Sequence, residues 1–228
     1  MRLCMFHPLD HPLERGWVGR IDGDQVVHLA AQTLQSFLTG GGSAREHAVY
    51  PLAEVRLLSP VLRPPAVRVF DEQGAFAFAN PAAIVGPGAS VRAAGAPLEL
   101  LPRLAAIVGV DGELAGYTLF ADWRLPAAPP PKDRDFALGL GPVLVTRDAF
   151  APDGLEVVVR VDGKVCEGGL LDGFDWAAAR DLAEEGTTLR PGDVLAGPAS
   201  GRVAEIVPGS SVEVDVREIG RLLATVSS

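Results

Sequence analysis

The sequence predicts a predominantly β protein of the α+β class, and three observations support this. Most apolar segments are short, and the clearest of them, LEVVVRV at 155–161, is rich in β-branched residues. Glycine and proline separate these segments at short intervals, which is typical of turns between strands. Only the segment 174–185 has the pattern of a convincing helix, with Asp172 or Gly173 as its cap and Gly186 as its stop.

The first 60 residues predict a small leading unit. Its expected elements are strands at 16–21 and 25–29, joined by a turn at 22–24, and a short helix at 30–38. The segment LLSPVLRPP at 57–65 ends in two adjacent prolines, which exclude regular structure and indicate a linker. We therefore expect a small N-terminal domain over 1–60 and a larger domain over 61–228.

The larger part predicts mainly strands. The run LAAIVGV at 104–110 is continuously apolar between polar residues, as expected of a buried strand. Further strands are expected at 116–121, 143–146, 155–161 and 211–216. The proline-rich segment LPAAPPP at 125–131 favours an extended path and predicts a stiff surface loop.

Charge and cysteine content exclude several classes of protein. The net charge is −9, and no cluster of Lys and Arg interleaved with aromatic residues is visible, which argues against a nucleic-acid partner. No apolar run approaches the roughly 20 residues that span a bilayer, and the N-terminus does not resemble a signal peptide. Cys4 and Cys166 lie far apart, so we expect two reduced thiols in a cytoplasmic protein.

Six groups of motifs follow one another along the chain. They are LAAIVG at 104–109, GYT and FADW at 116–123, KDRD and GPVLVT at 132–146, VDGK at 161–164, TLRPGDVL at 188–195, and PG and IGRL at 208–222. In this order and spacing they resemble the fumarylacetoacetate hydrolase family, from about residue 58 to the C-terminus. The resemblance implies a mixed β-roll or sandwich that forms a homodimer. It also implies hydrolysis, decarboxylation or isomerisation of small keto acids and diketo acids.

Members of that family hold a divalent cation, usually magnesium, with three carboxylates. The resemblance places Leu101 and Arg103 at the first two of these positions and Asp122 at the third. Leu101 cannot coordinate, and Arg103 brings a positive charge. At an effective dielectric of about 20, two like unit charges roughly 4 Å apart repel by about 4 kcal/mol. We therefore expect no cofactor, with Mg or Mn bound only if the family site survives.

Glu99 is a further candidate ligand at this site. Strand alternation would put Glu99 on the same face as Leu101 and Arg103, where it could reach the metal position or pair with Arg103. The alternative is a solvated glutamate at the end of the strand. If Arg103 and Asp122 face each other, a salt bridge between them would take the place of the metal.

Some of the other active-site positions of that family have matching residues in this sequence, and others do not. Lys132 matches the family's active-site lysine and is, with Asp122, the candidate catalytic residue. Arg103, Glu167 and Gly197 are the candidate substrate-binding residues. The family's histidine-bearing segment is missing, and His7, His11, His28 and His47 are expected at the surface or in turns. No general base that could activate water is therefore evident.

Three interpretations stay open. The chain could be a divergent enzyme that acts on a keto acid through Lys132 and Asp122. It could be a non-catalytic scaffold that binds a small anion at Arg103 and Lys132, or a protein partner. It could also be a structural remnant whose role lies in its interfaces. The residues favour the second interpretation, whereas the habit of the family favours the first.

Overall fold

The computed structural model describes all 228 residues, Met1–Ser228, and confirms a predominantly β fold with two short α-helices. The strands of the large sheet are β1 (Arg2–Pro8), β2 (Trp17–Asp22), β3 (Gln25–Leu29), β4 (Glu46–Pro51), β5 (Val55–Leu58), β6 (Val67–Phe70), β7 (Phe76–Ala79), β8 (Ile84–Val85), β10 (Leu98–Val108), β11 (Leu114–Arg124), β12 (Leu138–Thr146), β15 (Val194–Ala199) and β16 (Val203–Ile206). Those of the small sheet are β9 (Ala89–Arg92), β13 (Leu155–Val161), β14 (Lys164–Leu171), β17 (Ser211–Val216) and β18 (Gly220–Ser227).

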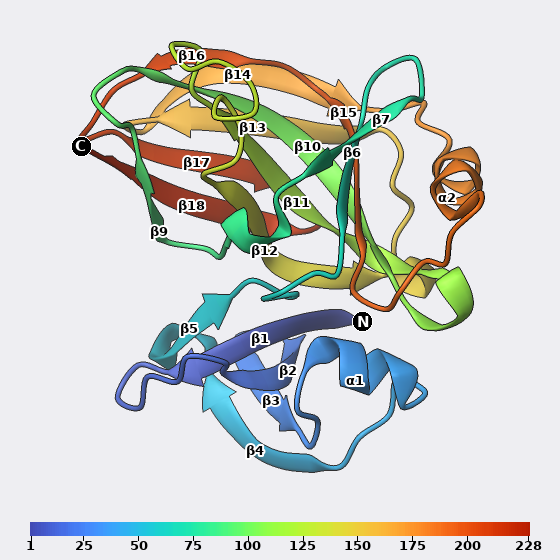
Figure 1. Cartoon of the computed structure of the whole chain (residues 1–228). Helices are drawn as coiled ribbons and strands as arrows, with labels where there is room; N and C mark the ends of the chain where they lie inside the picture. The colour runs from blue at the N-terminus through green and yellow to red at the C-terminus, as the bar shows by residue number, and fades with distance from the viewer.

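The two sheets pack into one β-rich body. The large sheet has the order β4-β3-β2-β1-β12-β11-β10-β15-β6-β7, and β5, β8 and β16 pair with β1, β12 and β10. The small sheet has the order β14-β13-β17-β18-β9, and Figure 1 shows it alongside β10, β11 and β12. Apolar side chains of both sheets, including Leu104, Leu119, Val214 and Leu222, share one buried cluster. Burial of this apolar surface is the main stabilising contribution to the arrangement.

The first 60 residues form the lower part of the molecule in Figure 1. They join the rest through β1, which pairs antiparallel with β12 at Arg2↔Val145 and Leu3↔Leu144. A second buried cluster combines Leu34 and Phe37 of this part with residues such as Phe120. The division at residue 60 stays a prediction, and the large sheet runs through both sides of it.

Both predicted helices are present but shorter than expected. Helix α1 (Leu34–Thr39) begins after Thr33, whose side chain accepts a hydrogen bond from the backbone of Ser36. Helix α2 (Trp176–Glu184) begins after Asp175, not after Asp172 or Gly173, because the Asp175 carboxylate accepts the hydrogen bond of the Ala178 backbone at 2.9 Å. Single turns of 3-10 helix lie at η1 (Leu52–Glu54), η2 (Pro81–Ala83), η3 (Val110–Gly112) and η4 (Arg147–Ala149). Neither α-helix is long and apolar enough to cross a membrane.

His7 differs from the expectation of a surface or turn histidine. It lies within β1, which is paired with β2 on one side and β5 on the other, and only 8% of it is exposed. Its ring nitrogen Nδ1 lies 2.9 Å from the Pro8 carbonyl oxygen, which accepts a hydrogen bond. One nitrogen of the buried ring is therefore paired within its own strand.

Candidate functional site

Strands β10 and β11 bring together Leu101, Arg103 and Asp122, the three positions at which the sequence resemblance predicts carboxylates. The strands are antiparallel, with Leu101 opposite Asp122 and Arg103 opposite Phe120. Residues directly opposite each other share a face of the sheet, and so do residues two apart on one strand. Leu101, Arg103 and Asp122 therefore project from the same face.

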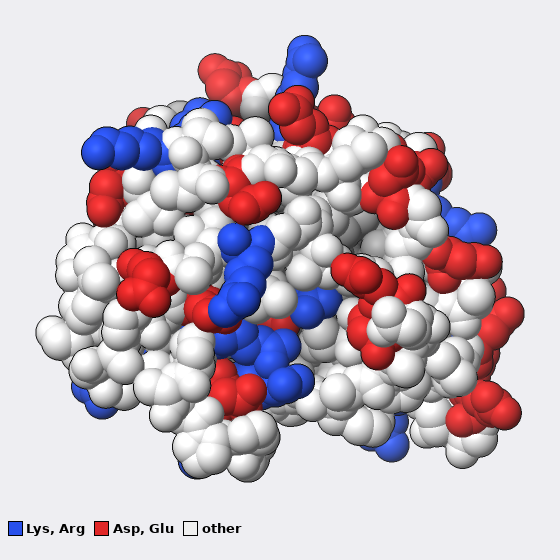
Figure 2. All heavy atoms as spheres, turned by 90° about the horizontal axis from the view of Figure 1, so that it is seen from above, with Lys and Arg blue, Asp and Glu red and all other residues white.

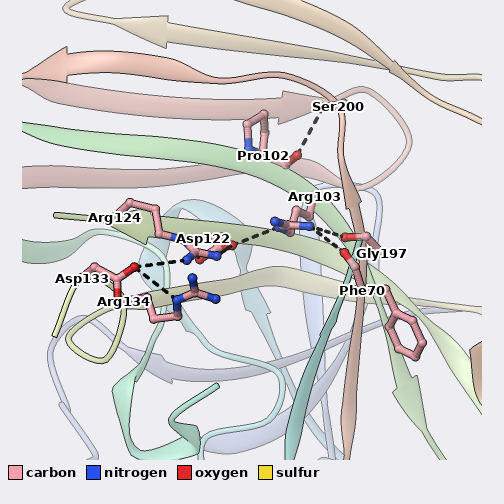
Figure 3. A network of polar contacts seen from close by, with 9 residues as sticks. All are labelled: Phe70, Pro102, Arg103, Asp122, Arg124, Asp133, Arg134, Gly197 and Ser200. Carbon is pink, nitrogen blue, oxygen red and sulfur yellow. Dashed lines mark hydrogen bonds and ion pairs between the residues drawn. The ribbon is translucent and has the colours of Figure 1, made fainter. Parts of the chain in front are cut away.

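Arg103 is surrounded by oxygen atoms from three other strands, although only 7% of the residue is exposed. Its Nε donates to Asp122 Oδ2 on β11 at 3.1 Å, and its Nη1 donates to two backbone carbonyls. These belong to Phe70 at the end of β6, at 3.1 Å, and to Gly197 in β15, at 2.9 Å (Figure 3). Burial lowers the pKa of Arg103, and the nearby Asp122 charge opposes that shift.

Asp122 is held by two arginines. Arg124 lies two residues further along β11 and donates from Nε to Oδ1 at 2.9 Å and from Nη2 to Oδ2 at 2.7 Å. This is the bidentate geometry in which arginine binds carboxylates most strongly. With Arg103 on Oδ2 as well, both oxygens of Asp122 are occupied by guanidinium groups, and only 1% of Asp122 is exposed.

The network continues outward through Asp133 and Arg134. Arg124 Nη1 lies 3.8 Å from Asp133 Oδ2, and Arg134 Nε donates to the same oxygen at 3.4 Å (Figure 3). We call Arg103, Arg124 and Arg134 the arginine cluster. Three positive side chains surround two carboxylates, Asp122 and Asp133, so the network has one positive charge in excess.

These side chains do not fit a divalent metal ion. Magnesium and manganese need several oxygen ligands, preferably carboxylates. Here Leu101 offers no oxygen, the Asp122 oxygens are taken by Arg103 and Arg124, and the guanidinium groups would repel a cation. No group of three or more His, Cys, Asp or Glu side chains in the chain is arranged to hold a metal ion.

The structure places Glu99 away from Arg103 and Asp122. In the strand register Glu99 lies opposite Arg124, but its carboxylate pairs with Arg202. Arg202 Nε donates to Glu99 Oε2 at 3.0 Å, and a second contact joins Arg202 Nη2 to Glu99 Oε1. Glu99 therefore forms a surface ion pair with Arg202 and is not paired with Arg103.

The remaining candidate residues divide into two groups. Gly197 joins the network through its carbonyl, and a side chain there would approach Trp176 within 3.2 Å. Lys132 does not join it, because its Nζ pairs with Asp135 Oδ2 at 2.7 Å and 73% of its side chain is exposed. Glu167 lies on β14, where its side chain lies close to Gly201, and it makes no hydrogen bond with Arg103 or Asp122.

Three side chains of the network were not among the sequence-predicted site residues. They are Arg124, Asp133 and Arg134. Arg124 lies outside the strand predicted at 116–121, but β11 extends to it, and its position two residues after Asp122 puts both side chains on one face. Asp133 and Arg134 follow the proline-rich loop, whose path no periodic pattern reveals.

The comparisons with known proteins agree with this fold. Residues 64–227 match the model of the fumarylacetoacetate hydrolase C-terminal domain, and the chain belongs to this family. A maleylpyruvate hydrolase from Sphingobium sp. SYK-6 superposes with a TM-score of 0.82 at 22% identity, covering 100% of this chain and 99% of that one. A fumarylacetoacetate hydrolase from Exiguobacterium antarcticum reaches 0.83 at 22% identity over 100% of both chains.

An isomerase also shares the fold. The 5-carboxymethyl-2-hydroxymuconate delta-isomerase of Mycobacterium smegmatis has a TM-score of 0.78 at 23% identity, covering 100% of this chain and 99% of that one. The Sphingobium maleylpyruvate hydrolase is also known in complex with manganese(II) and pyruvate. No curated protein matches this chain. At these identities the structural likeness shows the fold alone.

Proposed function

We propose that this chain is a metal-independent member of the fumarylacetoacetate hydrolase family that binds a small organic anion at the arginine cluster. The metal-dependent hydrolysis, decarboxylation or isomerisation of keto acids would then be absent. The observation that carries the proposal is the buried ion pair of Arg103 with Asp122. On this proposal the positive side chain of Arg103 takes the place of a carboxylate of the family's metal site.

The arginine cluster has donors left over for a ligand. Arg103 uses Nε and Nη1 within the protein, and its Nη2 makes no hydrogen bond there. Arg134 uses only Nε, and its side chain is 37% exposed. A carboxylate matches the planar guanidinium group and would neutralise the excess positive charge. Figure 2 shows Lys and Arg side chains gathered near the middle of one face, with most Asp and Glu side chains around them.

The size of the anion follows from the relatives. The Sphingobium maleylpyruvate hydrolase was crystallised with manganese(II) and pyruvate, a small keto acid. In the present chain the positive charge would come from Arg103 in place of a metal. A keto acid of similar size is therefore the expected ligand, and Lys132, which is paired with Asp135, is not needed to hold it.

Calorimetry and turnover assays test the proposal. We expect manganese chloride to give no binding heat, and pyruvate and oxaloacetate to bind with no metal added. The Arg134→Gln variant should weaken that binding, whereas Arg147→Gln, which removes a 61% exposed arginine outside the network, should not. Turnover of oxaloacetate or an acylpyruvate would favour the divergent enzyme instead. Absence of anion binding would favour the structural remnant.

A further inference from the structure

A second feature of the molecule lies in the N-terminal part of the large sheet, on residues that take no part in the arginine cluster. A cavity of about 550 Å³ is lined there by the rings of Trp17 and Tyr50 and by the acidic residues Asp10 and Glu54. Its volume is within the range of small-molecule sites, roughly 300–1,000 Å³. No Lys or Arg lines it.

The aromatic wall of this cavity is held in place by its neighbours. Trp17 and Tyr50 have ring centroids 6.0 Å apart, and both pack against the buried Phe6, at 5.9 and 5.6 Å. Trp17 is further fixed by stacking on His28, at 4.7 Å and an interplanar angle of 15°. The ring of His11 lies 6.5 Å from that of Trp17 and adds to the lining. The rings therefore form a preorganised surface of π electrons.

The acidic residues of the cavity have no cationic partner within the protein. Neither Asp10 nor Glu54 forms a salt bridge, although many of the other acidic residues do. The loop that carries Asp10 is fixed against the turn that carries Glu54, because the Leu9 backbone N–H donates to the Glu54 carbonyl at 2.9 Å. Two unpaired negative charges thus lie beside two aromatic rings.

We propose that this cavity binds a small organic cation with an alkylated ammonium group, of the trimethylammonium type. Aromatic faces attract cations through their quadrupole, and methylated ammonium groups suit them because little hydration is lost. Asp10 and Glu54 would supply the complementary charge, and Trp17 and Tyr50 the contact surface. A simple anion would be repelled, so this ligand differs in sign from the one proposed for the arginine cluster.

Titration with choline and with its uncharged isostere 3,3-dimethylbutan-1-ol tests the proposal by calorimetry. We expect choline to bind at least about ten times more tightly than the isostere, since shape is conserved and only the charge is lost. The double variant Asp10→Asn/Glu54→Gln should weaken choline binding several-fold, whereas Asp181→Asn, which alters an exposed acid on α2, should leave it unchanged.

Fluorescence locates the site independently. Trp17 is the tryptophan that lines this cavity, whereas Trp123 and Trp176 are 1% and 8% exposed, so Trp17→Phe should abolish a choline-induced change. Phosphatidylcholine vesicles carry the same head group. Co-sedimentation with them would assign the site to a lipid, and binding of choline alone would assign it to a free solute. Equal binding of choline and its isostere, or no binding of choline and the vesicles, would overturn the proposal.

Discussion

The guanidinium group of Arg103 and the carboxylate of Asp122 form a buried ion pair, with Nε 3.1 Å from Oδ2. Arg103 also donates to the carbonyls of Phe70 and Gly197, and Asp122 also accepts from Arg124. A cation surrounded by oxygens is thus built into the chain, at the position that the sequence resemblance assigns to a metal ion. The contribution of this ion pair to stability can be measured, and so can the effect of exchanging Arg103 for a carboxylate.

A double-mutant cycle should show that Arg103 and Asp122 stabilise the fold jointly. Asp122→Leu leaves Arg103 and Arg124 without a buried counter-charge and should cost about 3–5 kcal/mol of unfolding free energy. Arg103→Met should cost less, about 2–3 kcal/mol, because Arg124 still neutralises Asp122. The double variant should lose less unfolding free energy than the sum of the two single losses, and the difference should be about 1–3 kcal/mol.

Urea unfolding followed by tryptophan fluorescence measures this cycle. Arg147→Met is the control, because Arg147 and Glu113 form a pair whose side chains are 61% and 62% exposed. Such an exposed pair should contribute no more than about 1 kcal/mol. Simple additivity of the Arg103 and Asp122 substitutions would mean that their side chains do not interact in solution.

The two thiols should differ sharply in reactivity. Burial raises the pKa of Cys4 to about 12, an effect that the Arg2 charge only partly offsets, whereas Cys166 is exposed. Because the thiolate is the reactive form, a thiol reagent at pH 8 should label about one cysteine per native chain and about two in urea. The Cys166→Ser variant should show almost no labelling until it unfolds. Rapid labelling of native Cys166→Ser would show that β1 opens readily.

His28 should favour its neutral form in the folded protein. Burial lowers its pKa below the usual 6.5, and the nearby His47 lowers it further. A lowered folded-state pKa means that the unfolded chain takes up the proton first as the pH falls through 6.5, so this contribution to stability is present above pH 6.5 and lost below it. Proton NMR should place the His28 titration midpoint below 6.5, and His47→Ala should move it upward. A midpoint at or above 6.5 would contradict the partial burial of His28 beside His47.

Periodicity and strand order made much of the fold predictable. The β-branched run at 155–161 is the strand β13, and the apolar run at 104–110 covers most of the buried end of β10. Strand alternation puts Leu101 and Arg103 on one face, and the register of β10 with β11, left open by the sequence, adds Asp122 to that face. Apart from this register, these features depend on the hydrophobic pattern within each segment and on which strands follow one another, and both can be read from the sequence.

The partners of long side chains were not predictable in the same way. Lys132 pairs with Asp135 because of the path that the chain takes between β11 and β12, where prolines obscure any period. Glu99 pairs with Arg202, which is 103 residues away and lies just before β16. Such contacts depend on the path of the loops and on which of several oppositely charged side chains lies nearest. The periodicity of the sequence indicates neither.

Introducing carboxylates at positions 101 and 103 should create a metal site. Leu101→Glu/Arg103→Glu would place three carboxylates, with Asp122, on one face of β10 and β11, and Arg124 would remain to offset part of their repulsion. Three carboxylates on one face suit a hard divalent cation. We expect the variant to be less stable than the natural chain without metal and to recover about 2.7 kcal/mol when manganese is present at about 100 times its Kd.

Two control variants distinguish manganese coordinated by three carboxylates from manganese attracted nonspecifically to the introduced negative charges. Leu101→Glu alone keeps Arg103 and should bind no manganese, because the guanidinium group still occupies both Asp122 and the carbonyls of Phe70 and Gly197. Adding Asp122→Asn to the double variant removes the third ligand and should abolish most of the binding seen by calorimetry. Manganese binding that survives in this triple variant would show that Asp122 is not part of the site. Arg103 would then have to be understood as a structural residue of β10 and not as the replacement for a metal ion.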